Sequence, residues 1–271
     1  MSYAKVRGAR LYYQVLNPGG GPTVVMVHGL YTHHAIFFWC GAKGLAELGY
    51  RVVLYDLRGH GFSKGDRAGF RMQDLAEDLL GLMDYLEIDQ AFLAGYSLGG
   101  TIVVKTALMA PDRVLGLAIL EAAGLGSDEL VDVDDVDQTI TATLQSYAVS
   151  IGLALPARAE HQFRDQVHHL LDAGLLDDLR ADVGFFQNLP WGDISTPGVL
   201  VYGTDSPYIE ACRTAAANLV NSELVMMGGD HNMVVRYGEE ISATMIRFFE
   251  TIRQGRPWPE VQSGPRPTVG G

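Results

Sequence analysis

Short runs of apolar residues recur along this chain and alternate with longer segments whose apolar residues follow helical spacing. The runs lie at 11–16, 23–27, 51–55, 91–94, 115–120, 199–202 and 223–227, and each predicts a strand. The run at 23–27 is almost wholly apolar, which is typical of a strand buried on both faces of a parallel sheet. Helical stripes such as 74–86 and 242–252 lie between or after these runs. The alternation predicts βαβ units and a mostly parallel sheet of the α/β class.

The alternation stops between residues 125 and 188, where the pattern is helical and no convincing strand occurs. We therefore expect a core formed by residues 1–124 and 189–254, with a helical insertion at 125–188. Residues 255–271 are rich in proline and glycine, which predicts an extended tail outside the core.

Composition narrows the class of protein. The chain has 271 residues, 48% of them hydrophobic and 19% charged, which is enough apolar material for a large core. Its formal net charge of −12 disfavours a nucleic-acid binder, which usually carries a basic face. No apolar run approaches the ~20 residues that cross a bilayer, and the first residues lack the apolar segment of a signal peptide. We expect a cytoplasmic protein that binds neither nucleic acid nor membrane.

The most informative motif is a serine between two glycines, Gly95-Tyr96-Ser97-Leu98-Gly99, placed between a predicted strand and a predicted helix. A sharp strand-to-helix turn would hold Ser97 in a strained conformation with its Oγ clear of the sheet. Gly95 and Gly99 would let the strand and the helix approach closely. This context predicts a nucleophile.

A serine hydroxyl needs a base, and the base needs an acid that orients it. Asp205 follows the predicted strand at 199–202, and His231 follows the one at 223–227. The order Ser97, Asp205, His231 is the order expected of a hydrolase triad on a doubly wound sheet. Glu121, at the end of the run 115–120, is the main rival for the acid, and Asp230 is a weaker one.

The negative oxygen that forms during acyl transfer needs two N–H donors. The backbone N–H of Leu98, directly after the nucleophile, is the first candidate, and that of Leu30, in the loop after the first central strand, is the second. Gly29 would allow a close turn there. We expect His28 to support this loop rather than to catalyse.

These residues resemble the α/β-hydrolase superfamily from about residue 11 to residue 252. The resemblance is carried by His28-Gly29-Leu30, Asp56-Leu57-Arg58-Gly59-His60-Gly61-Phe62-Ser63, Gly95-Tyr96-Ser97-Leu98-Gly99-Gly100, Gly203-Thr204-Asp205 and Gly229-Asp230-His231. The block 56–63 looks like a structural loop of the single-chain esterase, haloperoxidase and lactonase-like members. The resemblance implies a doubly wound, mostly parallel eight-stranded sheet, with 125–188 as a cap over the active site. Epoxide hydrolase and dehalogenase members carry Asp at the position of Ser97, so both are disfavoured, whereas cofactor-independent dioxygenase members stay open.

Together, the motifs predict a serine hydrolase that cleaves a carboxylic ester, lactone or thioester of a small, largely apolar molecule through an acyl-enzyme. An acyltransferase or C–C bond hydrolase with the same triad, and a non-enzymatic small-molecule receptor on the same fold, are the alternatives. We expect no cofactor and no metal. The pairs His33–His34 and His168–His169 are adjacent in sequence, not spaced to chelate from one helix face.

Overall fold

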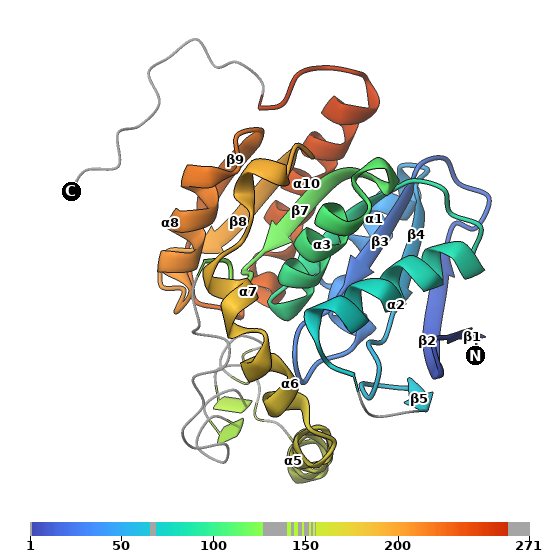
Figure 1. The fold of residues 1–271 in the computed structure, drawn as a ribbon, viewed down its shortest axis with the longest axis vertical. Helices are drawn as coiled ribbons and strands as arrows, with labels where there is room; N and C mark the ends of the chain where they lie inside the picture. Colours follow the sequence, from blue (N-terminus) through green and yellow to red (C-terminus); the bar gives the residue numbers. More distant parts are fainter. Residues whose placement is uncertain are drawn as a thin grey trace.

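One twisted sheet forms the centre of the molecule in the computed structural model, which describes residues 2–65, 69–126, 140–141, 144–145, 148, 152, 154 and 156–259. Its strands are β1 (Ser2–Val6), β2 (Ala9–Leu16), β3 (Thr23–Val27), β4 (Arg51–Tyr55), β5 (Lys64–Gly65), β6 (Ala91–Tyr96), β7 (Val114–Leu120), β8 (Gly198–Gly203) and β9 (Ser222–Met227). Eight of them follow the order β1-β2-β4-β3-β6-β7-β8-β9, and the short β5 pairs with β2 (Figure 1). The pairings of β2 with β1, β4 and β5 are antiparallel, and every pairing from β4 to β9 is parallel. The predicted mostly parallel, eight-stranded sheet is confirmed.

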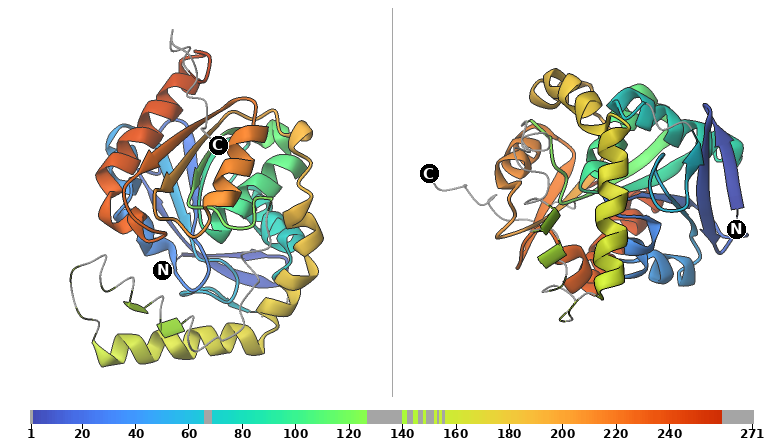
Figure 2. Two further views of the ribbon diagram at one scale, coloured as in Figure 1. Left: turned by 90° about the vertical axis from the view of Figure 1, so that its left-hand side faces the viewer. Right: turned by 90° about the horizontal axis from the view of Figure 1, so that it is seen from below.

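Helices cover both faces of this sheet. They are α1 (Ala42–Glu47), α2 (Met72–Tyr85), α3 (Leu98–Met109), α5 (Ala157–Asp172), α6 (Leu175–Ala181), α7 (Val183–Gln187), α8 (Ile209–Asn218), α9 (Met233–Arg236) and α10 (Gly238–Arg253), with 3-10 turns at His34–Phe38, Pro111–Arg113 and Trp191–Asp193. Helices α2, α3 and α8 lie on one face, and α1 and α10 lie on the other (Figures 1 and 2). None of the described helices is long and apolar enough to cross a membrane.

The central strands divide their side chains between two hydrophobic clusters because successive residues of a strand point to opposite faces. In β3, Val25 and Val27 pack on the side of α2 and α3, whereas Val24 and Met26 pack on the side of α1 and α10. All four are fully buried. A nearly continuous apolar run is therefore what such a strand requires.

The insertion between β7 and β8 lies across one end of the sheet (Figure 2). Val167 of α5 packs with Ile140 and Leu144 in a small cluster, and Tyr31, from the loop after β3, packs against that cluster. The insertion therefore lies over the end at which the parallel strands finish. Within 125–188 the longer described segments are the helices α5, α6 and α7, whereas residues 127–139 and several up to 155 lie outside the described residues.

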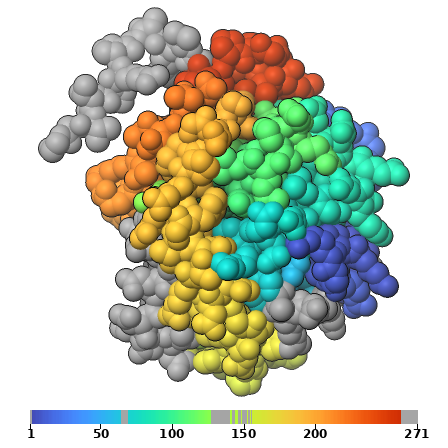
Figure 3. Space-filling view, viewed as in Figure 1, coloured from blue at the N-terminus to red at the C-terminus, as the bar shows by residue number. Residues whose placement is uncertain are grey.

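Two carboxylates of the insertion bond the backbone at and just before the start of helix α2. Asp178 accepts a hydrogen bond from the N–H of Phe70 at 2.8 Å, and Asp182 accepts one from the N–H of Met72 at 2.6 Å. Asp182 also pairs with the guanidinium of Arg71 at 3.0 Å. Negative groups stabilise a helix N-terminus, so α6 is fastened to the core next to α2, where the two segments form one continuous surface (Figure 3).

The prediction that residues 255–271 form a tail outside the core is wrong at Trp258, whereas residues 255–257 are exposed. Trp258 is 7% exposed, its ring lies 4.8 Å from that of Phe248, and its Nε1 donates to the carbonyl of Gly198 at 2.8 Å. A large indole with a satisfied N–H joins the core readily, despite the prolines on either side of it. Residues 260–271 of the predicted tail lie outside the described residues.

Candidate active site

Ser97 occupies the turn between β6 and α3, as the motif predicts. Its backbone has φ 55° and ψ −124°, a strained conformation for a residue with a side chain. A Cβ on Gly95 would collide with the backbone of Gly99, and one on Gly99 would collide with the carbonyl of Val27. The two glycines are therefore required by the close approach of strand and helix.

The imidazole of His231 bridges Ser97 and a buried carboxylate. His231 Nε2 lies 3.1 Å from Ser97 Oγ, and His231 Nδ1 lies 3.1 Å from Oε2 of Glu121. The carboxylate accepts from Nδ1–H, and this leaves Nε2 free to accept the Ser97 proton. The structure thus joins a hydroxyl, an imidazole and a carboxylate in one chain of hydrogen bonds.

Glu121 follows β7 directly and is completely buried. Besides His231, it accepts hydrogen bonds from the backbone N–H of Gly203 and from Oγ of Ser206, the latter at 2.7 Å. A buried carboxylate is tolerated only where donors replace its lost water. These donors therefore satisfy the two oxygens of the buried Glu121 side chain beside the imidazole.

Asp205, the residue predicted to orient His231, is exposed, and its place at Nδ1 is taken by Glu121. The Asp205 backbone N–H donates to the carbonyl of Gly229 at 3.0 Å, and its carboxylate accepts from Thr204 Oγ1 at 3.5 Å. The turn after β8 directs the N–H of Gly203 inward and the Asp205 side chain outward. The prediction for Asp205 is corrected in favour of the rival acid.

The other rival acid, Asp230, is also exposed, and its carboxylate accepts from the N–H of Asn232 at 3.0 Å. It therefore holds the turn that carries His231, while Glu121 is the carboxylate at Nδ1.

Two tyrosines enclose the imidazole. The ring of Tyr96 stacks on it with centroids 5.1 Å apart, and the Tyr96 hydroxyl donates to the His231 carbonyl at 3.1 Å. The ring of Tyr208 meets it edge-on at 4.8 Å. Sequence reasoning missed both tyrosines and Ser206, although all three are close in sequence to predicted site residues. An aromatic enclosure of this kind fixes the plane of the imidazole.

The loop after β3 lies directly against the nucleophile. A Cβ built on Gly29 would sit 2.7 Å from Cβ and 3.3 Å from Oγ of Ser97, so the next residue, Leu30, follows a backbone in contact with the serine. Leu98 is the first residue of α3, where backbone N–H groups lack intrahelical partners. His28 is buried and holds this loop: Nδ1 donates to the Gly29 carbonyl at 2.8 Å, and Nε2 accepts from the N–H of Leu57 at 3.0 Å and lies 3.9 Å from Oδ1 of Asp56.

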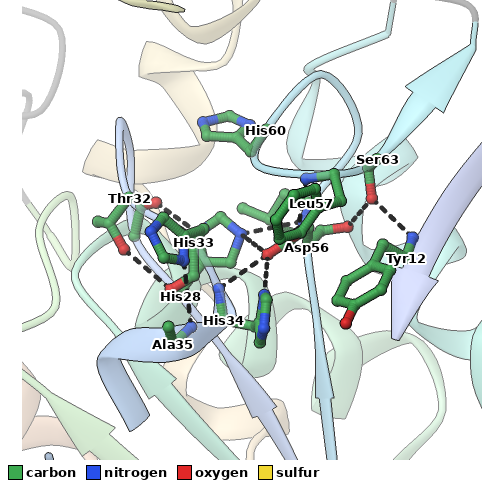
Figure 4. Close-up of polar contacts among 12 residues, drawn as sticks. Tyr12, His28, Thr32, His33, His34, Ala35, Asp56, Leu57, His60 and Ser63 are labelled. Atoms are coloured by element: carbon green, nitrogen blue, oxygen red, sulfur yellow. Dashed lines mark hydrogen bonds and ion pairs between the residues drawn. The ribbon is translucent and has the colours of Figure 1, made fainter. Parts of the chain in front are cut away.

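Asp56 is the centre of a neighbouring hydrogen-bond network (Figure 4). Its Oδ1 accepts from the N–H of His34 at 2.8 Å and from His34 Nδ1 at 2.7 Å, and its Oδ2 accepts from the N–H of Phe62 at 2.8 Å. Burial alone would favour the protonated acid, but the bonds from His34 hold the pKa of Asp56 below its ordinary value. The network ties the loop after β3 to the loop after β4.

His33, His34 and Asp56 could each offer one ligand atom to a metal ion, all within 4.8 Å of one another. However, His34 Nδ1 and Asp56 Oδ1 bond to each other, and His34 Nε2 lies 3.0 Å from Nε2 of Gln14. His33 Nδ1 accepts from the N–H of Ala35 at 3.3 Å. The cluster is thus explained by the internal hydrogen bonds that hold the loop.

Comparison with known proteins identifies the fold. Residues 22–148 match the model of a family described as alpha/beta hydrolase fold. The enol-lactonase from Burkholderia xenovorans LB400 superposes with a TM-score of 0.73 at 23% identity, over 92% of this chain and 100% of that one. At this identity the likeness establishes the fold alone.

Two curated relatives are similar in sequence. A dihydrolipoyllysine-residue acetyltransferase component of the acetoin cleaving system of Pseudomonas putida is 37% identical over 131 residues, 45% of this chain and 33% of its own length. The chain thus spans only about a third of that relative. A 2-(acetamidomethylene)succinate hydrolase of Mesorhizobium japonicum is 26% identical over 261 residues, 89% of this chain and 92% of the relative.

Proposed function

We propose that this chain, which has the α/β-hydrolase fold, is a serine hydrolase that acts through an acyl-enzyme. Its substrate is a carboxylic ester, lactone or thioester of a small, largely apolar molecule. The observation that carries the proposal is the chain of hydrogen bonds from Ser97 through His231 to Glu121. A hydroxyl, a base and a buried carboxylate in this order make up an activated nucleophile.

In the first half of the reaction, His231 Nε2 takes the Ser97 proton while Oγ attacks the substrate carbonyl. The backbone N–H groups of Leu98 and Leu30 stabilise the resulting oxyanion, and one such donor is worth about 3 kcal/mol. Glu121 stabilises the imidazolium and holds its tautomer. His231 then protonates the leaving group, and the acyl group remains on Ser97.

In the second half, water enters in place of the leaving group. His231 takes a proton from the water as it attacks the acyl-enzyme. The second tetrahedral intermediate then collapses with cleavage of the C–Oγ bond, and His231 returns the proton to Ser97 Oγ as the acid leaves. The helical insertion at 125–188 serves as a cap that limits the size of the acyl group and keeps bulk water from the intermediate.

The primary experiment is an ester and lactone screen with Ser97→Ala as the blank. We expect the wild-type protein to turn over short acyl esters or lactones and to be labelled by a fluorophosphonate probe. Ser97→Ala is expected to fold normally and to lose both properties. Ester cleavage that persists in Ser97→Ala would refute the assignment of the nucleophile.

A matched pair of variants tests the acid. Glu121→Gln keeps the size of the side chain but removes the charge, and we expect kcat to fall roughly 10³- to 10⁴-fold, as for other triad carboxylates. Asp205→Asn makes the same change on the exposed loop and should alter kcat by less than about threefold. The opposite ranking would return the role of the acid to Asp205.

The same triad also supports transfer of the acyl group to an alcohol or thiol and cleavage of a C–C bond, and the Pseudomonas putida relative is named as an acetyltransferase component. Product analysis with an added alcohol acceptor, and with a β-diketone, separates these reactions from hydrolysis. A receptor on this fold would bind a small molecule with slow or absent turnover, so the measured turnover separates it from an enzyme.

A further inference from the structure

The loop after β8 does not provide the triad acid, but it hydrogen-bonds the residue that does, Glu121. Ser206, in this loop, is 6% exposed, and its Oγ donates to Glu121 Oε2 at 2.7 Å. Oε2 is the same oxygen that lies 3.1 Å from His231 Nδ1. The Ser206 hydroxyl and the imidazole therefore share one carboxylate oxygen.

The direction of the Ser206 hydroxyl is set by its neighbour. Its Oγ accepts a hydrogen bond from the N–H of Tyr208 at 3.1 Å, which occupies a lone pair and leaves the O–H to point at Glu121. The ring of Tyr208 is the one that meets the His231 imidazole edge-on. The segment 206–208 thus contacts both partners of the Nδ1–Oε2 hydrogen bond.

We propose that Ser206 is a positioning residue of the active site, acting through Glu121. This inference rests on the proposed function. When His231 accepts the Ser97 proton, its Nδ1–H bond to Oε2 becomes a bond between two charged groups, which is stronger only if the oxygen lies in line with the donor. The Ser206 hydroxyl holds Oε2 in that line, because the bond from Gly203 fixes only the other oxygen.

The first test compares Ser206→Ala with Ser206→Thr. Loss of the hydroxyl should lower kcat roughly 10- to 100-fold, as expected for a misplaced catalytic group, and leave KM unchanged. Threonine keeps a hydroxyl and should recover most of the loss. Ser222→Ala is the control. Ser222 is the first residue of β9, and its hydroxyl donates to the carbonyl of Leu219 at 2.6 Å, so its loss should leave kcat unchanged.

The second test is a double-mutant cycle. If Ser206 acts through Glu121, then Ser206→Ala should change kcat by less than about threefold in the Glu121→Gln background, because the group it positions is already lost. An equal fold-loss in both backgrounds would overturn the proposal, as would unchanged kcat in Ser206→Ala alone.

A spectroscopic readout keeps the test independent of substrate and of the folding of Glu121→Gln. The Nδ1–H proton of His231 should give a low-field proton NMR resonance that moves upfield in Ser206→Ala and returns in Ser206→Thr. An unmoved resonance would contradict the proposal. If wild-type turnover and probe labelling of Ser97 are both absent, the proposed function is wrong. If both are present but Ser206→Ala changes neither kcat nor the resonance, only this inference is wrong.

Discussion

Lowering the pH from 7 to 5 should destabilise this protein through two histidines near the oxyanion loop. Burial, together with repulsion from His60 once that ring is protonated, lowers the pKa of His28 from 6.5 to about 3. Burial also lowers the pKa of His60 from 6.5 to about 4. Both side chains are therefore neutral in the folded protein at pH 5, whereas in the unfolded chain they take up protons below about pH 6.5.

The sign follows from proton uptake. Because the unfolded chain binds more protons than the folded one, the free energy of unfolding falls as the pH drops below 6.5, and it continues to fall until the folded pKa values are reached. Each histidine costs about 1.4 kcal/mol per pH unit in this window, so the two together remove about 4 kcal/mol by pH 5. This figure depends only on the unfolded pKa as long as both folded values lie below 5.

Urea unfolding at pH 7 and pH 5 measures this loss of stability. The variant His60→Asn separates the contribution of His60 from that of His28. Asparagine can keep the bond that His60 Nδ1 makes to the Arg58 carbonyl at 2.9 Å, but it does not titrate. The loss between pH 7 and pH 5 should then fall to about 2 kcal/mol. His161→Asn, on the exposed face of α5, is the control and should leave the full loss in place. A pH dependence that is the same in His60→Asn and wild type would refute the argument.

Three further predictions concern single contacts. Gly29→Ala places a carbon against Ser97 and should reduce kcat/KM at least tenfold and lower the melting temperature, whereas unchanged activity would contradict the close approach of this loop. Asp78→Asn removes the carboxylate that lies 2.6 Å from the buried Arg58 guanidinium, so urea unfolding should show a loss of about 3–5 kcal/mol, and no loss would show that this ion pair does not stabilise the fold. Asp182→Ala removes a cap from α2 and should cost about 1 kcal/mol by the same measurement; no loss would show that the cap contributes nothing.

The sequence predicted the central strands closely because burial on both faces leaves a continuous apolar run. The runs at 23–27 and 51–55 coincide with β3 and β4. The edge strand β1 was not predicted, since only Ala4 and Val6 of its five residues are buried and the signal is too short. The apolar pattern therefore predicts a strand best where both faces of the sheet are buried.

The candidate site was likewise predicted only in part from the sequence. Ser97 and the position of His231 after β9 follow from local motifs, and the structure brings their side chains together. The acid does not follow, because Glu121 and Asp205 both lie just after strands. Which of them faces inward depends on the turn that follows each strand, and strand patterning carries no information about that turn.

The burial of Trp258 fixes where this fold can be shortened. The indole covers Phe248 and the first residue of β8, so a chain cut at residue 254 would leave an open apolar hollow and an unsatisfied carbonyl on that side. Such a shortened chain would expose a hydrophobic patch at the start of β8, whereas Ser97 follows the end of β6. It would aggregate or unfold at a lower temperature for reasons unrelated to catalysis. Purification tags and fusion partners therefore belong beyond residue 259.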